Sequence, residues 1–76
     1  MNPGGTHQAW PRLLAAYGEL VDAEAFQART GDAAGLVATQ QRMTPLIERF
    51  LDMAGTADAA TGARLAALAA IRRETE

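Results

Sequence analysis

The chain has 76 residues, seven basic and nine acidic side chains, no cysteine and a net charge of −2, so it forms one small domain without disulfides or thiolate metal sites. The negative charge argues against binding to nucleic acid or to an anionic membrane surface, because such binding depends on basic side chains near phosphate groups. No apolar run of about 18 residues is present, and the N-terminus lacks a charged region followed by an apolar core. We therefore expect neither a membrane span nor a signal peptide, and a cytoplasmic location.

Alanine, the residue that most favours the α-helix, is the commonest residue, whereas β-branched and aromatic residues are few. The composition predicts an all-α fold, and the chain divides into three amphipathic segments. We expect an antiparallel helical hairpin followed by a shorter third helix, packed as a small helical bundle.

Residues 1–8 are rich in turn-forming residues and are predicted to be a flexible N-terminal tail before one helical domain over residues 9–76. The first helix is expected over about residues 11–30, with Pro11 in its first turn. Gly18 lies near the edge of the apolar stripe and is expected to allow close approach of a neighbouring helix. Phe26 points away from that stripe, which predicts a second contact surface. The stripe itself consists of Trp10, Leu14, Tyr17, Val21, Ala25 and Ala28.

The turn between the first two segments is the most specific feature of the sequence. Gly31 is suited to end a helix in the left-handed conformation, and Asp32 is suited to cap the next helix. Because one helix ends and the next begins at adjacent residues, the sequence predicts a tight helical hairpin.

The second helix is expected over about residues 33–54. Gln40 interrupts its apolar stripe, and Pro45 lies nearly opposite to it. Pro45 either kinks a continuous helix or starts a new helix that Thr44 caps. The stripe consists of Leu36, Met43, Ile47, Phe50 and Ala54, flanked by Leu46, Leu51 and Met53.

The third helix is expected over about residues 58–74, with Asp58 and Thr61 as candidate N-caps. Its large apolar residues are Leu65, Leu68 and Ile71, the weakest stripe of the three. Arg72 and Arg73 lie near its C-terminus, where positive charge complements the helix dipole.

No arrangement of side chains indicates catalysis or a cofactor. His7 is the only histidine, and no serine is present. Glu48 and Asp52 lie one turn apart, but the Glu-x-x-His motifs of di-iron bundles are absent, so a solvated face is the preferred interpretation. We predict a protein that is not an enzyme and that uses no metal or cofactor.

Protein binding is the predicted activity, because apolar side chains cluster on the second helix. Methionine suits a groove that accepts a partner helix, although the same cluster also suits the core of the hairpin. The predicted partner-binding residues are Phe26, Met43, Leu46, Phe50, Met53, Leu65 and Leu68.

The stretch from residue 13 to residue 53 resembles the flagellar export chaperones of the FlgN and FliT type. It contains Leu-Leu-Ala-Ala-Tyr, then Thr-Gly-Asp, then Leu-Val-Ala-Thr-Gln-Gln-Arg-Met-Thr-Pro-Leu-Ile-Glu-Arg-Phe-Leu. The family pattern usually runs longer, and Gln40 and Pro45 interrupt it here. The resemblance implies a small cytoplasmic chaperone that holds an amphipathic segment of an export substrate on its second helix.

Two functions therefore remain open. The first is a secretion-type chaperone or adaptor whose partner is an amphipathic helix. The second is a structural or regulatory subunit that acts through homo-oligomerisation, because a small domain without disulfides often depends on self-association. In either case a second copy would complete a larger helical bundle.

Overall fold

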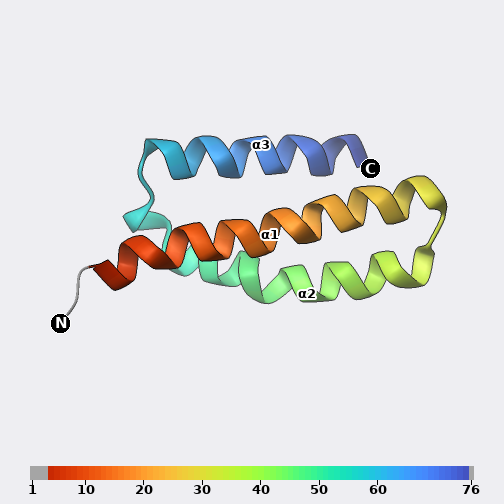
Figure 1. The fold of residues 1–76 in the computed structure, drawn as a ribbon, viewed down its shortest axis with the longest axis horizontal. Helices are drawn as coiled ribbons and strands as arrows, with labels where there is room; N and C mark the ends of the chain where they lie inside the picture. The colour runs from red at the N-terminus through yellow and green to blue at the C-terminus, as the bar shows by residue number, and fades with distance from the viewer. Residues whose placement is uncertain (1–3, 76) are drawn as a thin grey trace.

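The computed structural model describes residues 4–75, which form three α-helices and one short 3-10 helix. These are α1 (Gly4–Thr30), α2 (Ala33–Asp52), η1 (Ala54–Thr56) and α3 (Ala59–Thr75). Helix α1 packs against both α2 and α3 (Figure 1). The predicted all-α fold, a hairpin with a shorter third helix, is confirmed.

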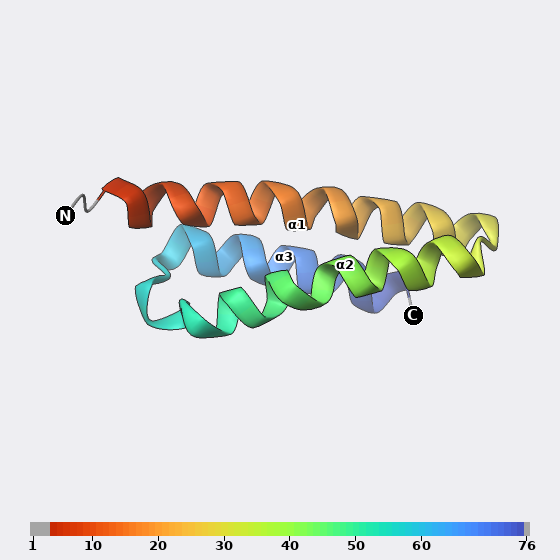
Figure 2. The ribbon, with the colours of Figure 1, turned by 90° about the horizontal axis from the view of Figure 1, so that it is seen from below.

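The three helices form an elongated bundle that measures 46 × 20 × 16 Å. Helix α2 runs antiparallel to α1, and α3 reverses direction again. Figure 2 shows α1 along one side of the molecule, with α2 and α3 on the other side. Because α1 is the helix that both neighbours contact, the side between α2 and α3 is the open side of the bundle.

The first helix begins earlier than predicted, at Gly4 instead of near Pro11. The predicted tail is therefore wrong for residues 4–8, whose backbone is helical, while residues 1–3 lie outside the described residues. Pro11 lies inside the helix, where it removes one hydrogen bond. Packing of Trp10 offsets this loss: its indole Nε1 donates to Thr56 Oγ1 at 2.7 Å, and its ring stacks on Phe50 at 5.5 Å.

The turn between α1 and α2 has the predicted geometry. Gly31 adopts a left-handed φ of 74°, and the Asp32 N–H donates to the Gln27 carbonyl at 2.9 Å, as in a Schellman motif. Asp32 Oδ1 then accepts a hydrogen bond from the Gly35 N–H at 2.9 Å. Two adjacent residues thus end one helix and cap the next.

Helix α2 continues through Pro45, so the alternative of a break at this residue is wrong. Thr44 does not cap a new helix, because its hydroxyl donates to the Gln40 carbonyl at 3.2 Å. The helix ends at Asp52 instead of Ala54, and Gly55 lies in η1.

Helix α3 begins at Ala59, and Asp58 is its N-cap. Asp58 Oδ1 accepts a hydrogen bond from the Thr61 N–H at 2.8 Å, so Asp58 and not Thr61 is the cap. Gly18 lies beside Arg64 and Leu68, and a Cβ at this position would lie 3.2 Å from the Arg64 guanidinium. The predicted close approach of a helix at Gly18 is confirmed.

The core is built from all three helices around Phe50. Tyr17 meets the Phe50 ring edge-on, with centroids 5.1 Å apart, while Trp10 stacks on it. The buried hydrophobic residues of the described chain are Trp10, Tyr17, Val21, Met43, Phe50 and Leu68.

Substituting Gly31 by alanine is expected to lower the free energy of unfolding by about 1 kcal/mol. A Cβ makes the left-handed conformation unfavourable, although no atom lies within 4 Å to clash with it. Urea unfolding measured by circular dichroism tests this. Gly62→Ala is the matched control, because Gly62 lies in α3 with open space around it, and alanine should stabilise that helix by about 0.5 kcal/mol. Equal effects of the two substitutions would contradict the assignment of strain to Gly31.

Candidate functional site

A buried carboxylate joins the three helices. Glu24 of α1 is only 2% exposed. Its Oε1 accepts a hydrogen bond from Arg72 Nε of α3 at 2.9 Å, and its Oε2 accepts from Arg72 Nη2 at 3.1 Å. Gln40 of α2 donates its amide Nε2 to Oε2 at 3.1 Å. We call Tyr17, Glu24, Gln40 and Arg72 the polar cluster.

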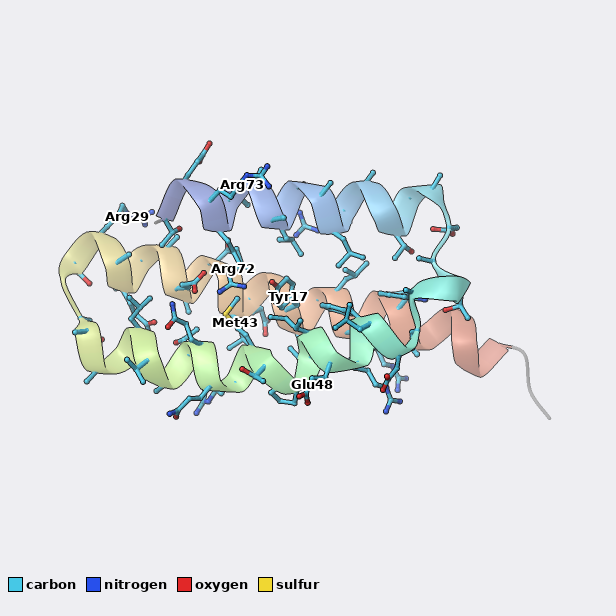
Figure 3. The ribbon with its side chains drawn as sticks, turned by 180° about the vertical axis from the view of Figure 1, so that it is seen from behind. Tyr17, Arg29, Met43, Glu48, Arg72 and Arg73 are labelled. Carbon is cyan, nitrogen blue, oxygen red and sulfur yellow. The ribbon has the colours of Figure 1, made fainter. Side chains whose placement is uncertain are left out.

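The polar cluster extends to the aromatic core through Tyr17. Arg72 Nη1 donates to the Tyr17 hydroxyl at 3.3 Å, so one guanidinium contacts both a carboxylate and a phenol of α1. Figure 3 shows Arg72, Tyr17 and Met43 in the space between α2 and α3. The fork of the arginine matches the two carboxylate oxygens, which makes this a bidentate pair.

Two opposing effects act on the ionisation of Glu24. Burial raises the pKa of its carboxyl, but the hydrogen bonds from Arg72 and Gln40 and the positive charge of Arg72 together lower the pKa below its ordinary value of 4.5. The hydrogen bond with Glu24 raises the pKa of Arg72, in spite of its burial. Glu24 and Arg72 are therefore an ion pair at neutral pH.

Glu24 is not among the site residues predicted from the sequence. It lies seven residues after Tyr17, which itself lies seven residues after Trp10, so Glu24 is in phase with the apolar stripe of α1. An acidic residue in phase with such a stripe is the signal of a buried partner. Gln40 interrupts the stripe of α2 for the same reason, since its amide faces Glu24.

A second polar contact lies nearer the hairpin turn. The hydroxyl of Thr39, which is buried, hydrogen-bonds to the side-chain amide of Gln27 at 2.7 Å. Polar pairs between α1 and α2 are thus concentrated toward the turn, while aromatic packing holds the opposite end.

Two hollows flank the last turns of α3. One, of about 370 Å³, lies between α2 and α3 and is lined by Glu24, Leu36, Gln40, Arg72 and Thr75. The other, of about 330 Å³, lies between α1 and α3 and is lined by Ala25, Ala28, Arg29, Ile71, Glu74 and Thr75. The charged groups that line the first hollow, Glu24 and Arg72, already bind each other.

The predicted partner-binding residues do not form one exposed surface. Met43, Phe50 and Leu68 are buried, so their core interpretation is confirmed. Leu46, Met53 and Leu65 are half-buried and pack against that core. Phe26 alone is largely exposed, at 59%. It lies two residues from Glu24, about 200° around α1, and therefore on the side away from the polar cluster.

Helix α2 carries an exposed stripe that the sequence interpretation did not single out. Val37 and Leu51 are large apolar residues with exposures of 53% and 72%. Between them, in steps of three and four residues, lie Gln40 and Thr44, which are exposed, and Ile47, which is half-buried. We call Val37, Gln40, Thr44, Ile47 and Leu51 the lateral stripe.

The lateral stripe lies beside the buried residues of α2, Thr39, Met43 and Phe50. Gln40 is the member of the stripe that reaches toward α3, because its amide donates to Glu24 and it lines the hollow between α2 and α3. Glu48, which lies just outside the lateral stripe, projects from the edge of α2 that faces away from α3 (Figure 3). Val37, Thr44 and Leu51 of the lateral stripe are thus exposed on the surface of α2.

Among the side chains that the structure describes, those of residues 9–75, no group of three or more acidic residues is placed to hold a metal ion. Over residues 4–75, no helix is both long enough and apolar enough to cross a membrane. Comparison of the chain with protein-family models, with curated proteins and with solved structures found no match.

Replacing Glu24 by glutamine is expected to lower the free energy of unfolding at pH 7 by about 2 kcal/mol, because Arg72 loses its anionic partner. Since the pKa of Glu24 is lower in the folded chain, the ion pair stabilises the fold fully above about pH 4.5 and loses this effect as the pH falls through the folded pKa. The difference between wild type and variant should therefore shrink in acid. Chemical unfolding at a series of pH values measures it.

Glu19→Gln is the matched control for this prediction, because it removes the same charge from an exposed position of α1. It should change the free energy of unfolding by less than about 0.5 kcal/mol. A Glu24→Gln variant whose stability loss is the same at pH 7 and in acid would contradict the role of the ion pair.

Proposed function

We propose that this protein is a non-enzymatic, cytoplasmic binding protein of the secretion or flagellar export chaperone type, which holds an amphipathic helix of a partner. The proposed binding surface is the lateral stripe of α2. The observation that carries the proposal is the exposure of Val37 and Leu51 on α2, a helix that packs against α1.

The geometry of the lateral stripe suits a helix as the ligand. Its residues recur in alternating steps of three and four, which is how one helix presents side chains to another. The stripe has apolar ends and a polar centre. A partner helix would therefore bury Val37 and Leu51 with apolar side chains and place hydrogen-bonding side chains opposite Gln40 and Thr44.

The fold supports the same proposal, although more generally. The antiparallel hairpin and its Gly31–Asp32 turn are the features that carry the resemblance to the export chaperones. The groove implied by that resemblance used Met43 and Phe50, which are buried in the core. The proposal therefore moves the binding surface from the core stripe of α2 to the lateral stripe.

The probes for testing this function are fluorescently labelled peptides that span the amphipathic helices of flagellar and secretion substrates encoded in the same genome. Fluorescence anisotropy should detect binding of at least one peptide to the wild-type protein. Leu51→Glu should weaken that binding at least tenfold, because full burial of a leucine side chain is worth about 2 kcal/mol.

Phe26→Glu is the matched control, because Phe26 is an exposed apolar residue on a different side of the bundle. It should leave peptide binding unchanged. Equal loss in both variants, or no binding of any of the peptides by the wild-type protein, would refute the proposal.

A further inference from the structure

We propose that the last turns of α3 form an acid-sensitive latch. Residues 69–75 are held against the α1–α2 hairpin by the ion pair between Glu24 and Arg72, and they separate from it when Glu24 is protonated. We call residues 69–75 the latched segment. This inference goes beyond the proposed function, because it concerns a movement of α3 and does not depend on the lateral stripe.

Apolar packing contributes little to holding the latched segment in place. Leu68, the buried residue of α3, lies just before it. Ile71 is its large apolar residue, and this side chain is half-buried. The other side chains are small or polar, namely Ala69, Ala70, Arg72, Arg73, Glu74 and Thr75. The latched segment therefore removes little apolar surface from water when it docks.

The two hollows described above flank the latched segment. Arg72 and Thr75 line the hollow of about 370 Å³ between α2 and α3, whereas Ile71, Glu74 and Thr75 line the hollow of about 330 Å³ between α1 and α3. A side chain that borders a hollow has no contact atoms on that side, so dispersion attraction contributes less there. Since Thr75 borders both hollows, separation of the latched segment would join them into one groove along the hairpin.

The ion pair is the specific attachment of the latched segment. Arg72 donates to both carboxylate oxygens of Glu24, at 2.9 and 3.1 Å, and to the Tyr17 hydroxyl at 3.3 Å. The side chain of Glu24 is 3% exposed, while that of Arg72 is 30% exposed. When the latched segment separates, both groups gain water, but they lose their bidentate contact. The position of the latched segment therefore depends on the charge of Glu24.

The surroundings of Glu24 determine the direction of the pH effect. Burial raises the pKa of its carboxyl, but the hydrogen bonds from Arg72 and Gln40 and the charge of Arg72 hold that pKa below 4.5. Such a group stabilises the closed state above its ordinary pKa and loses this effect as the pH falls through the folded pKa. The latch is thus closed at neutral pH and opens in acid. The polar and charged groups around Glu24 and the latched segment are Arg72 of α3, Gln40 of α2, Tyr17 of α1 and, at the other hollow, Arg29 and Glu74.

The rest of the bundle is held by other contacts, so the opening is local. Phe50 of α2 stacks on Trp10 and meets Tyr17 edge-on, which joins the two helices of the hairpin. The first turns of α3 begin at the Asp58 cap and end at the buried Leu68. Segments with few buried apolar contacts open at a lower free energy than the core does.

Distances between pairs of spin labels, measured by pulsed electron paramagnetic resonance, test the latch. The chain contains no cysteine, so labels attach only to introduced ones. Asp22→Cys with Arg73→Cys measures the distance from α1 to the latched segment. Two control pairs are Asp22→Cys with Arg42→Cys, across the hairpin, and Arg12→Cys with Ala63→Cys, from α1 to the first turns of α3. All five positions are exposed.

In the Glu24→Gln background at pH 7, the 22–73 distance should lengthen by about 5 Å or more, which is half the diameter of a helix. Both control distances should stay unchanged, as should all three distances in the Glu19→Gln background. With Glu24 present, the 22–73 distance should lengthen as the pH falls below 4.5, at a higher pH than the control distances. An unchanged 22–73 distance in Glu24→Gln, or a simultaneous change of all three distances, would overturn the proposal.

A second variant tests whether the charge of Glu24 is the trigger. Glu24→Met combined with Arg72→Met replaces the ion pair by apolar side chains, a change that buried ion pairs commonly tolerate. The latched segment of this double variant should stay closed at the pH at which the wild-type segment opens. If its 22–73 distance lengthens at the same pH as in the wild type, protonation of Glu24 does not open the segment, and the proposal is wrong.

Discussion

The buried carboxylate of Glu24 is the constraint on which the arrangement of the helices depends. It needs a cation and hydrogen-bond donors, and these come from Arg72 on α3 and Gln40 on α2. A purely apolar contact between alanine-rich helices would permit many relative positions, since small side chains have little shape. A bidentate ion pair permits few, because both oxygens must meet the guanidinium at once. Glu24 thus specifies where α3 lies along α1, and Gln40 specifies the position of α2.

Local capping signals were predictable from the sequence because they involve neighbouring residues. Gly31 must adopt a positive φ, and Asp32 and Asp58 cap the helices that follow them, so the hairpin and the start of α3 could both be inferred. The N-terminal extension of α1 could not. It depends on contacts of Trp10 with Thr56 and Phe50, which are distant in sequence, and these stabilise a turn that Pro11 alone would disfavour.

The candidate binding surface was predicted only in part, for a related reason. Apolar periodicity identifies the face of a helix that avoids water, but it does not say whether the same chain or another chain covers it. Met43 and Phe50 have the strongest periodic signal, and the chain itself covers them. Val37 and Leu51 belong to the lateral stripe, on another face of α2. Because Gln40 and Thr44 lie between them, this face has no continuous apolar periodicity in the sequence. The role of Glu24 could not be predicted from its own helix, because its cationic partner, Arg72, lies 48 residues later on α3.

The packing of Trp10 has a spectroscopic consequence. This residue is the only tryptophan of the chain, and its indole lies between α1, Phe50 of α2 and Thr56 of η1. The environment of the Trp10 indole therefore changes if this end of the bundle, where α2 passes into α3, opens. The chain thus contains an intrinsic fluorophore at one end of the bundle, which follows the docking of η1 without any label.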